Sequence, residues 1–199
     1  MYYSQLGQDR DVLSVYKKGG YFVEIGASDG IELSNTYLLE QLGWKGICVE
    51  PIPARFEKLV KNRKAICFNK AVYHTSDLEV VFSIANKYDL LSGIKDYLTT
   101  YKDDILNNHT DIFVETKTLN DILNEANAPL FIEYLSLDTE GTELEILKSV
   151  DHSKYKFGII DVEHNYQEPM RTDIRNYLWD KGYVLAYENK WDDRYVYSK

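Results

Sequence analysis

Acidic side chains stand at the ends of two apolar runs in the second half of this sequence. Asp138 ends the run 130–138 and Glu140 follows two residues later, while Glu163 and His164 stand near the end of the run 157–165. Carboxylates and imidazoles can accept a proton from a hydroxyl group in a transition state. These four residues are therefore candidates for general base catalysis, although Asp138 could instead cap a helix and His164 could be structural.

A glycine turn follows an earlier apolar run, in the stretch "GGYFVEIGASDG" (19–30). The dinucleotide fingerprint G-x-G-x-x-G requires a glycine where this chain has Ser28, between Gly26 and Gly30. Glu24 precedes the turn and Asp29 lies within it, and these acids repel phosphate groups but favour a positively charged ligand. The turn therefore argues against a dinucleotide.

Glu50 ends the next apolar run, 26 positions after Glu24. An acid at the end of the second strand of such a fold accepts hydrogen bonds from the two ribose hydroxyls of a nucleotide. A ribose, no pyrophosphate and a positive charge are together the properties of S-adenosylmethionine, so this pattern predicts that cofactor.

A metal-assisted mechanism is the alternative for the acidic residues. Asp138, Glu163 and Asn165 offer the oxygen ligands that Mg²⁺ or Mn²⁺ prefers, and a bound cation lowers the pKa of a hydroxyl. His164 interrupts the adjacent acid–amide pair that such sites use. The sequence therefore gives the metal mechanism less support than a metal-free one.

The elements that must position these residues alternate between strands and helices. Helices are expected over 34–44, from Pro53, from Thr118 and Thr142 with capping boxes to Asp121 and Glu145, and over 169–181. Strands are expected over 21–26, 45–50, 64–72, 78–85, 130–138 and 157–165, with a terminal hairpin of 183–188 and 194–198. Residues 86–110 read as a long loop with one helical turn, and this loop is expected to supply acceptor contacts together with the hairpin. This order predicts one α/β domain over 1–199, with a mainly parallel sheet and helices on both faces.

Composition narrows the class of ligand. The net charge of −9 disfavours binding to nucleic acid, which needs a positive surface. The two cysteines, Cys48 and Cys67, lie in apolar runs and are expected in the core, and no apolar stretch reaches the about 20 residues of a membrane helix. The start of the sequence lacks the pattern of a signal peptide, so a cytoplasmic location and a small-molecule or glycan partner are expected.

Several blocks of the chain together resemble the FkbM family of S-adenosylmethionine-dependent methyltransferases. They are "SQLGQD" (4–9), "FVEIGASDG" (22–30), "SNTYLLEQLGWKGICVEPIP" (34–53), "SLDTEGTELEIL" (136–147) and "VEHN" (162–165). The resemblance implies a Rossmann-like class I methyltransferase sheet of seven strands, one of them antiparallel. It also implies O-methylation, frequently of a sugar hydroxyl or a polyketide-type hydroxyl.

The resemblance further implies roles for individual residues. Glu24, Gly26 and Gly30 would line the methionine and ribose portions, with Glu50 on the ribose hydroxyls. The remaining cofactor contacts would come from Gln5, Asp9, Ser34, Asn35, Thr36, Asn69, Ala71 and Asp138. Two other functions stay open at this point, namely a nicotinamide-dependent oxidoreductase and a cofactor-binding module without catalysis.

Overall fold

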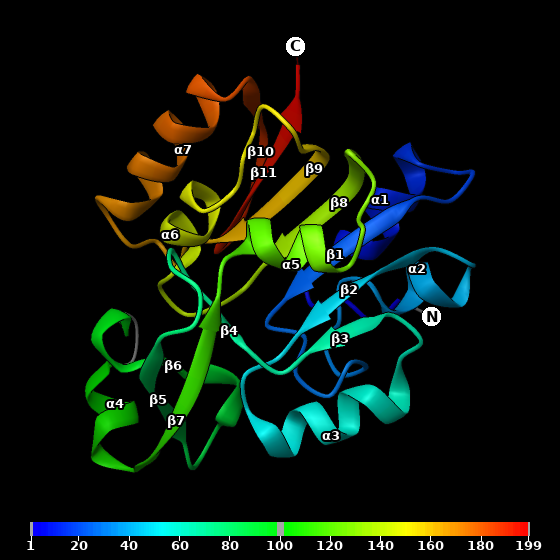
Figure 1. Cartoon of the computed structure of the whole chain (residues 1–199). Helices are drawn as coiled ribbons and strands as arrows, with labels where there is room; N and C mark the ends of the chain where they lie inside the picture. The colour runs from blue at the N-terminus through cyan, green and yellow to red at the C-terminus, as the bar shows by residue number, and fades with distance from the viewer. Residues whose placement is uncertain (1, 99–101, 199) are drawn as a thin grey trace.

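The computed structural model describes residues 2–98 and 102–198 of the chain, and its main sheet has seven strands (Figure 1). Their order is β10-β11-β9-β8-β1-β2-β3. The strands are β1 (Tyr21–Ile25), β2 (Lys45–Val49), β3 (Ile66–Phe68), β8 (Phe131–Leu137), β9 (Lys156–Glu163), β10 (Tyr183–Asn189) and β11 (Asp192–Tyr197). Neighbouring pairs from β9 to β3 are parallel, and β11 is antiparallel to both β9 and β10. The prediction of a mainly parallel sheet with a terminal hairpin is therefore confirmed.

Helices cover both faces of the main sheet. On one face, Val12, Leu39 and Leu59 of the three N-terminal helices pack with Phe22. On the other face, residues of α5, α6 and α7 pack with Val23. The helices are α1 (Gln8–Val15), α2 (Tyr37–Gln41), α3 (Pro53–Asn62), α5 (Leu119–Glu125), α6 (Glu143–Lys148) and α7 (Met170–Asp180). Successive residues of β1 thus alternate between the two cores, as the pleat of a strand requires.

A second sheet lies below one end of the main sheet in the view of Figure 1, with the order β4-β7-β5-β6. It comprises β4 (Ala71–Val72), β5 (Glu79–Ala85), β6 (Gly93–Ile94) and β7 (His109–Lys117). The predicted strand 64–72 is confirmed over β3 but is too long, because Asn69 and Lys70 separate β3 from β4 and the two strands belong to different sheets.

The predicted loop 86–110 also has more regular structure than expected. Residues 99–101 of this stretch lie outside the described residues. The stretch contains the short 3₁₀ helices η1 (Asp89–Leu91) and η2 (Lys95–Tyr97), strand β6 and helix α4 (Lys102–Asn107). Strand β7, which begins at His109, pairs with β5 along its whole length and was not predicted. Its first three residues are polar and Phe113 is exposed, so the strand lacks a clear apolar alternation.

Two predicted capping boxes have different outcomes. The Thr118 hydroxyl accepts a hydrogen bond from the Asp121 amide at 3.1 Å, so the N-cap half of the first box is confirmed. The reciprocal bond is replaced, because the Thr118 amide donates to Ser76 Oγ at 2.9 Å. Thr142 makes no capping bond at the start of α6. The Glu143 carboxylate accepts hydrogen bonds from the amides of Thr139 and Gly141, which lie in the turn before the helix. The prediction for Thr142 and Glu145 is therefore wrong in its chemistry, although a helix does begin there.

None of the helices in the described ranges is long and apolar enough to cross a membrane.

Candidate active site

A cavity of about 320 Å³ lies at the carboxyl edge of the main sheet. Four parallel strands end on it, with Gly26 after β1, Glu50 after β2, Asp138 after β8 and Glu163 at the end of β9. Residues around η1 and β6 of the second sheet line it as well. The carboxyl edge of a parallel sheet is where ligands bind in open α/β folds, so this cavity is the candidate active site.

Gly26 is required by close approach of two strands. Its φ of +86° is a left-handed conformation, and a Cβ atom there would lie 1.9 Å from the carbonyl oxygen of Asp138. Gly30 has a similar φ of +82°, but a Cβ at that position would meet Leu59 and Arg63 of the helical layer. Of the two glycines singled out in the sequence, Gly26 lines the cavity, whereas Gly30 packs against α3.

Glu50 faces the cavity from a buried position. Its carboxylate accepts hydrogen bonds from the Ser28 amide at 2.9 Å and the Ile52 amide at 2.7 Å. Burial raises the pKa of Glu50 to about 7, and these two hydrogen bonds oppose the rise. Each oxygen of a carboxylate can accept more than one hydrogen bond, so Glu50 retains capacity for the hydroxyl groups of a ribose.

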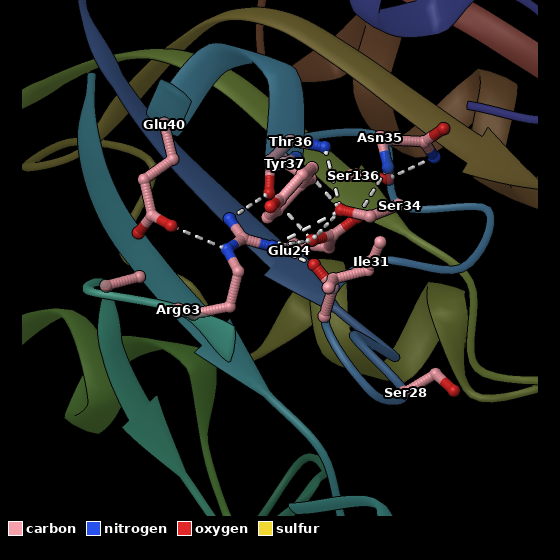
Figure 2. A network of polar contacts seen from close by, with 12 residues as sticks. Glu24, Ser28, Ile31, Ser34, Asn35, Thr36, Tyr37, Glu40, Arg63 and Ser136 are labelled. Carbon is pink, nitrogen blue, oxygen red and sulfur yellow. Dashed lines mark hydrogen bonds and ion pairs between the residues drawn. The ribbon is translucent and has the colours of Figure 1, made fainter. Parts of the chain in front are cut away.

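Glu24 lies in a different environment from Glu50. Its carboxylate accepts hydrogen bonds from the Ser34 and Thr36 hydroxyls and from the Asn35 amide, at 2.7–3.0 Å. Arg63 approaches from the opposite side, with Nη1 at 3.2 Å from Glu24 Oε2. Figure 2 shows Glu24 at the centre of this network. The acid that appeared to select a positively charged ligand is thus neutralised by a cation within the protein.

The same network changes what residues 34–36 can do. The Ser34 and Thr36 hydroxyls donate to Glu24, and the Asn35 side-chain amide donates to Ser136 Oγ at 2.8 Å (Figure 2). Helix α2 has only five residues and so adds little dipole of its own. Ser34 and Asn35 line the cavity but their donors already have partners, so the structure gives no support to the predicted binding of a methionine carboxylate by these groups.

Two segments predicted to contact the cofactor each contribute one of their two residues. Gln5 lines the cavity, whereas Asp9 accepts hydrogen bonds from Tyr3 and Ser4 and holds the N-terminal segment instead. Ala71 lines the cavity, whereas the Asn69 amide donates to the carbonyl oxygens of Glu50 and Pro51. Asp9 and Asn69 therefore support the cavity wall without being part of its lining.

Three acidic residues cluster at the β8–β9 end of the cavity. One carboxylate oxygen from each of Asp138, Glu140 and Glu163 lies within 4.8 Å of the others. Burial raises the pKa of Asp138 to about 6, and burial together with repulsion from Asp138 raises the pKa of Glu140 to about 9. Burial, together with repulsion from Asp138 and Glu140, raises the pKa of Glu163 well above its usual range. The three acids that the sequence singled out at the ends of these two strands therefore do lie close together.

His164 turns away from this cluster. It does not line the cavity, its Nδ1 accepts a hydrogen bond from the Tyr166 amide at 2.9 Å, and its Nε2 lies 3.4 Å from Asp193. Consecutive residues at the end of a strand point to opposite faces, so Glu163 and His164 cannot both face the cavity. The predicted role of His164 as a base therefore has no support in the geometry.

Sequence reasoning missed two acidic residues of the cavity lining, Asp192 and Asp161. Asp192, at the start of β11, pairs in register with Glu163 and accepts a hydrogen bond from Gln8 Nε2 at 2.6 Å. Burial raises the pKa of Asp192 to about 7, with repulsion from Asp138 adding to the rise. Asp161 lies within an apolar strand, where Arg194 Nε at 2.6 Å and the Tyr134 hydroxyl at 2.8 Å satisfy it. An acid inside an apolar run was the signal that could have revealed Asp161.

Helix α3 and the second sheet are joined across the cavity. Arg55 of α3 forms a two-pronged ion pair with Asp89 of η1, with Nε at 2.8 Å from Oδ2. Tyr88, Leu90 and Leu91, on either side of Asp89, line the cavity between this ion pair and Glu50. We call residues 88–94 the roof of the cavity, because they cover it from the side of the second sheet.

A family model described as "Methyltransferase FkbM domain" matches residues 24–185. No curated protein matches the sequence.

Solved structures of low sequence identity share the fold. One is the candidate RNA methyltransferase PH1948 from Pyrococcus horikoshii, with 12% identity and a TM-score of 0.51 over 96% of this chain and 82% of the other. A second is magnesium protoporphyrin IX methyltransferase from Synechocystis PCC 6803 with bound S-adenosylmethionine, with 12% identity and a TM-score of 0.50 over 96% and 80%. A third is precorrin-6y C5,15-methyltransferase from Geobacter metallireducens GS-15, with 13% identity and a TM-score of 0.50 over 96% and 87%.

Proposed function

Because the chain belongs to the FkbM methyltransferase family, we propose that it transfers a methyl group from S-adenosylmethionine to a hydroxyl group of a sugar or sugar-bearing small molecule. One observation carries this proposal. A single cavity joins Glu50, which has the environment of a ribose-binding acid, to Asp138, which can accept a proton.

The residues at the Glu50 end fit the cofactor. The ribose hydroxyls would donate to the Glu50 carboxylate, and the left-handed turn at Gly26 leaves the backbone bare where a ligand must approach closely. Gln5 and Ala71 also line the cavity, and we keep them as cofactor contacts in this proposal. When bound, S-adenosylmethionine supplies an electrophilic methyl group on a sulfonium ion.

The residues at the other end would act on the acceptor. Asp138 lies at the end of β8 beside the glycine turn and stays accessible from the cavity, so it is placed to accept the hydroxyl proton. Bound S-adenosylmethionine would supply the methyl group and leave as S-adenosylhomocysteine, and the Asp138 carboxylate would accept the proton of the acceptor hydroxyl. The protein's main contribution is to hold the hydroxyl in line with the methyl group.

The polarity of the cavity supports a polyhydroxylated acceptor. Asp138, Glu140, Glu163 and Asp192 are strong hydrogen-bond acceptors, and sugar hydroxyls are donors that match them. A nucleic-acid acceptor, which the fold of the PH1948 structure brings to mind, would place phosphates near these acids and near a chain of net charge −9. The sequence prediction of a non-nucleic-acid acceptor therefore remains part of the proposal.

Calorimetry with S-adenosylhomocysteine tests the cofactor, with NAD as the competing ligand. We expect S-adenosylhomocysteine to bind and NAD not to bind. Binding of NAD alone would indicate an oxidoreductase. Binding of S-adenosylhomocysteine without methyl transfer to any of a panel of mono- and disaccharides would instead support a cofactor-binding module without catalysis.

The acceptor is then identified by incubating the protein with labelled S-adenosylmethionine and the same saccharide panel. Transfer of label to an oxygen, located by mass spectrometry of the product, is the expected result. Glu57→Gln, an exposed change on α3 outside the cavity, is a matched control for carboxylate variants. Transfer to nitrogen or carbon would overturn the O-methylation part of the proposal.

A further inference from the structure

The cluster of Asp138, Glu140 and Glu163 differs from the buried acids elsewhere at this edge of the sheet. Glu24 has Arg63 and Asp161 has Arg194 as a counter-charge. Glu50 and Glu143 accept hydrogen bonds from backbone amides, and Asp192 accepts a hydrogen bond from the side-chain amide of Gln8. The protein thus provides each of these acids with a donor of its own.

The cluster lacks comparable donors in the part of the chain that the structure describes. Asn165 Nδ2 lies 3.4 Å from Glu140 Oε2, which is a long hydrogen bond. Glu163 Oε2 is buried against protein atoms and has no hydrogen-bond partner among the described residues. An unpaired buried carboxylate oxygen is costly, and beside two further carboxylates that cost falls when a proton or a cation neutralises the group.

Among the described residues, no basic side chain of the cavity lining neutralises this cluster. The two basic residues that line the cavity are Arg55 and Lys70. Arg55 is paired with Asp89 and Lys70 with Glu115. Both come after β2 in the chain, toward the Glu50 side of the sheet, whereas the cluster lies at β8 and β9.

We propose that Asp138, Glu140 and Glu163 bind one divalent cation of the Mg²⁺ or Mn²⁺ type. Their oxygens are spaced closely enough to share one ion, and an all-oxygen ligand set favours these hard cations over zinc or copper. Cys48 and Cys67 lie in or beside the core around α1–α3, and His164 faces Asp193, so no soft ligand among the described residues reaches the site.

The use of the cation rests on the proposed function. A cation held beside Asp138 lowers the pKa of an acceptor hydroxyl that contacts it, which makes the hydroxyl a better nucleophile. A carboxylate has two oxygens, so one oxygen of Asp138 can contact the cation while the other accepts the proton. Binding of the cation itself does not depend on that reaction.

Titration with Mn²⁺ tests the proposal directly. The chelator-treated protein is titrated with MnCl₂ by calorimetry, and free Mn²⁺ is followed by electron paramagnetic resonance. The same titration is made with and without S-adenosylhomocysteine. We expect one Mn²⁺ per chain in the wild type and in Glu57→Gln. Glu140→Gln and Glu163→Gln should each weaken Mn²⁺ binding at least about tenfold.

Melting curves separate loss of the ligand from loss of the fold. Each glutamine variant removes one of three neighbouring carboxylates, so without Mn²⁺ it should melt at the same temperature as the wild type or higher. Added Mn²⁺ should raise the melting temperature of the wild type but not of the variants. Equal Mn²⁺ affinity in the wild type and both variants, or no Mn²⁺ binding by the wild type, would overturn the proposal.

Two further outcomes are informative. If glucosamine stabilises the wild type and Mn²⁺ does not, the cluster binds an ammonium group and the metal proposal is wrong. If Mn²⁺ binds as expected but S-adenosylhomocysteine does not, the cation site stands and the proposed function fails.

Discussion

Arg63 and Glu24 form an ion pair within the helical layer, with Arg63 Nη1 at 3.2 Å from Glu24 Oε2 and no exposed part of the Arg63 side chain. The same guanidinium contacts Glu40, with Nε at 2.9 Å from Oε2. One cation therefore neutralises two buried carboxylates and connects the end of β1 to the helices that cover it.

Arg63→Met should destabilise the protein by about 3–5 kcal/mol, because it leaves buried carboxylates without their counter-charge. Urea unfolding followed by tryptophan fluorescence measures the change. Lys61→Met, an exposed change two residues earlier on α3, should stay within about 0.5 kcal/mol of the wild type. Equal stability of the two variants would show that Glu24 does not need Arg63.

Gly26→Ala should lower the free energy of unfolding by more than the strain of a left-handed backbone alone would. Its Cβ would overlap the Asp138 carbonyl oxygen, so β1 and β8 must separate and the cavity must deform. Gly43→Ala is the control, because Gly43 has a φ of +93° but open space around the missing Cβ. We expect a loss of about 3 kcal/mol or more at Gly26 and about 1 kcal/mol at Gly43. Similar melting temperatures for the two variants would contradict the contact.

Binding of S-adenosylhomocysteine should weaken as the pH falls below about 7. The pKa of Glu50 is raised to about 7 by burial, so the ionised form that accepts the ribose hydroxyls is lost on the acidic side of that value. Calorimetry across this range measures the dissociation constant. Glu50→Gln should bind weakly at every pH and remove most of the slope, whereas Glu57→Gln should retain it. A flat profile in the wild type would remove Glu50 from the cofactor contacts.

Asp138→Asn and His164→Asn should separate catalysis from structure. Loss of a general base lowers the turnover number by about 10²–10⁴, so Asp138→Asn should still bind S-adenosylhomocysteine but turn over slowly. His164→Asn should lower the melting temperature while the turnover number stays near that of the wild type, because His164 does not line the cavity. A rate loss in His164→Asn larger than in Asp138→Asn would reverse these assignments.

Asp89→Asn should shorten the residence of S-adenosylhomocysteine. Asp89 joins the roof, residues 88–94, to Arg55 of α3, and weakening that ion pair lets the roof open more often. Stopped-flow dissociation should be severalfold faster, with a smaller change in the association rate. Glu125→Gln, which breaks an exposed pair with Lys117 away from the cavity, should leave both rates unchanged.

The sequence was sufficient to predict the main sheet because its central strands are buried on both faces. Runs such as 130–138 and 157–165 contain few polar residues, and that pattern predicts parallel strands and places Asp138 and Glu163 at one edge. The second sheet was harder, since β4 and β6 have two residues each and β7 begins with His109, Thr110 and Asp111 and exposes Phe113, so its alternation is broken. Such short strands form only by pairing with neighbouring strands that are distant in the sequence, and a local sequence pattern does not indicate that pairing.

The candidate site was predicted in part, for a related reason. A strand end fixes where a residue lies, so Glu50, Asp138 and Glu163 reach the cavity as expected. It does not fix which face the side chain takes, and His164 therefore turns toward Asp193. The roles of Arg63 and Asp192 depend on pairs that are far apart in the sequence, Glu24 with Arg63 and Glu163 with Asp192.

The second sheet occupies one uninterrupted stretch of the chain, from β4 to β7, and the chain enters it at Asn69 and Lys70. The strands that carry Gly26, Glu50, Asp138 and Glu163 lie before or after that stretch. Replacement of residues 71–117 would therefore exchange the roof and Ala71 together, while the four strand ends stay in the parent chain.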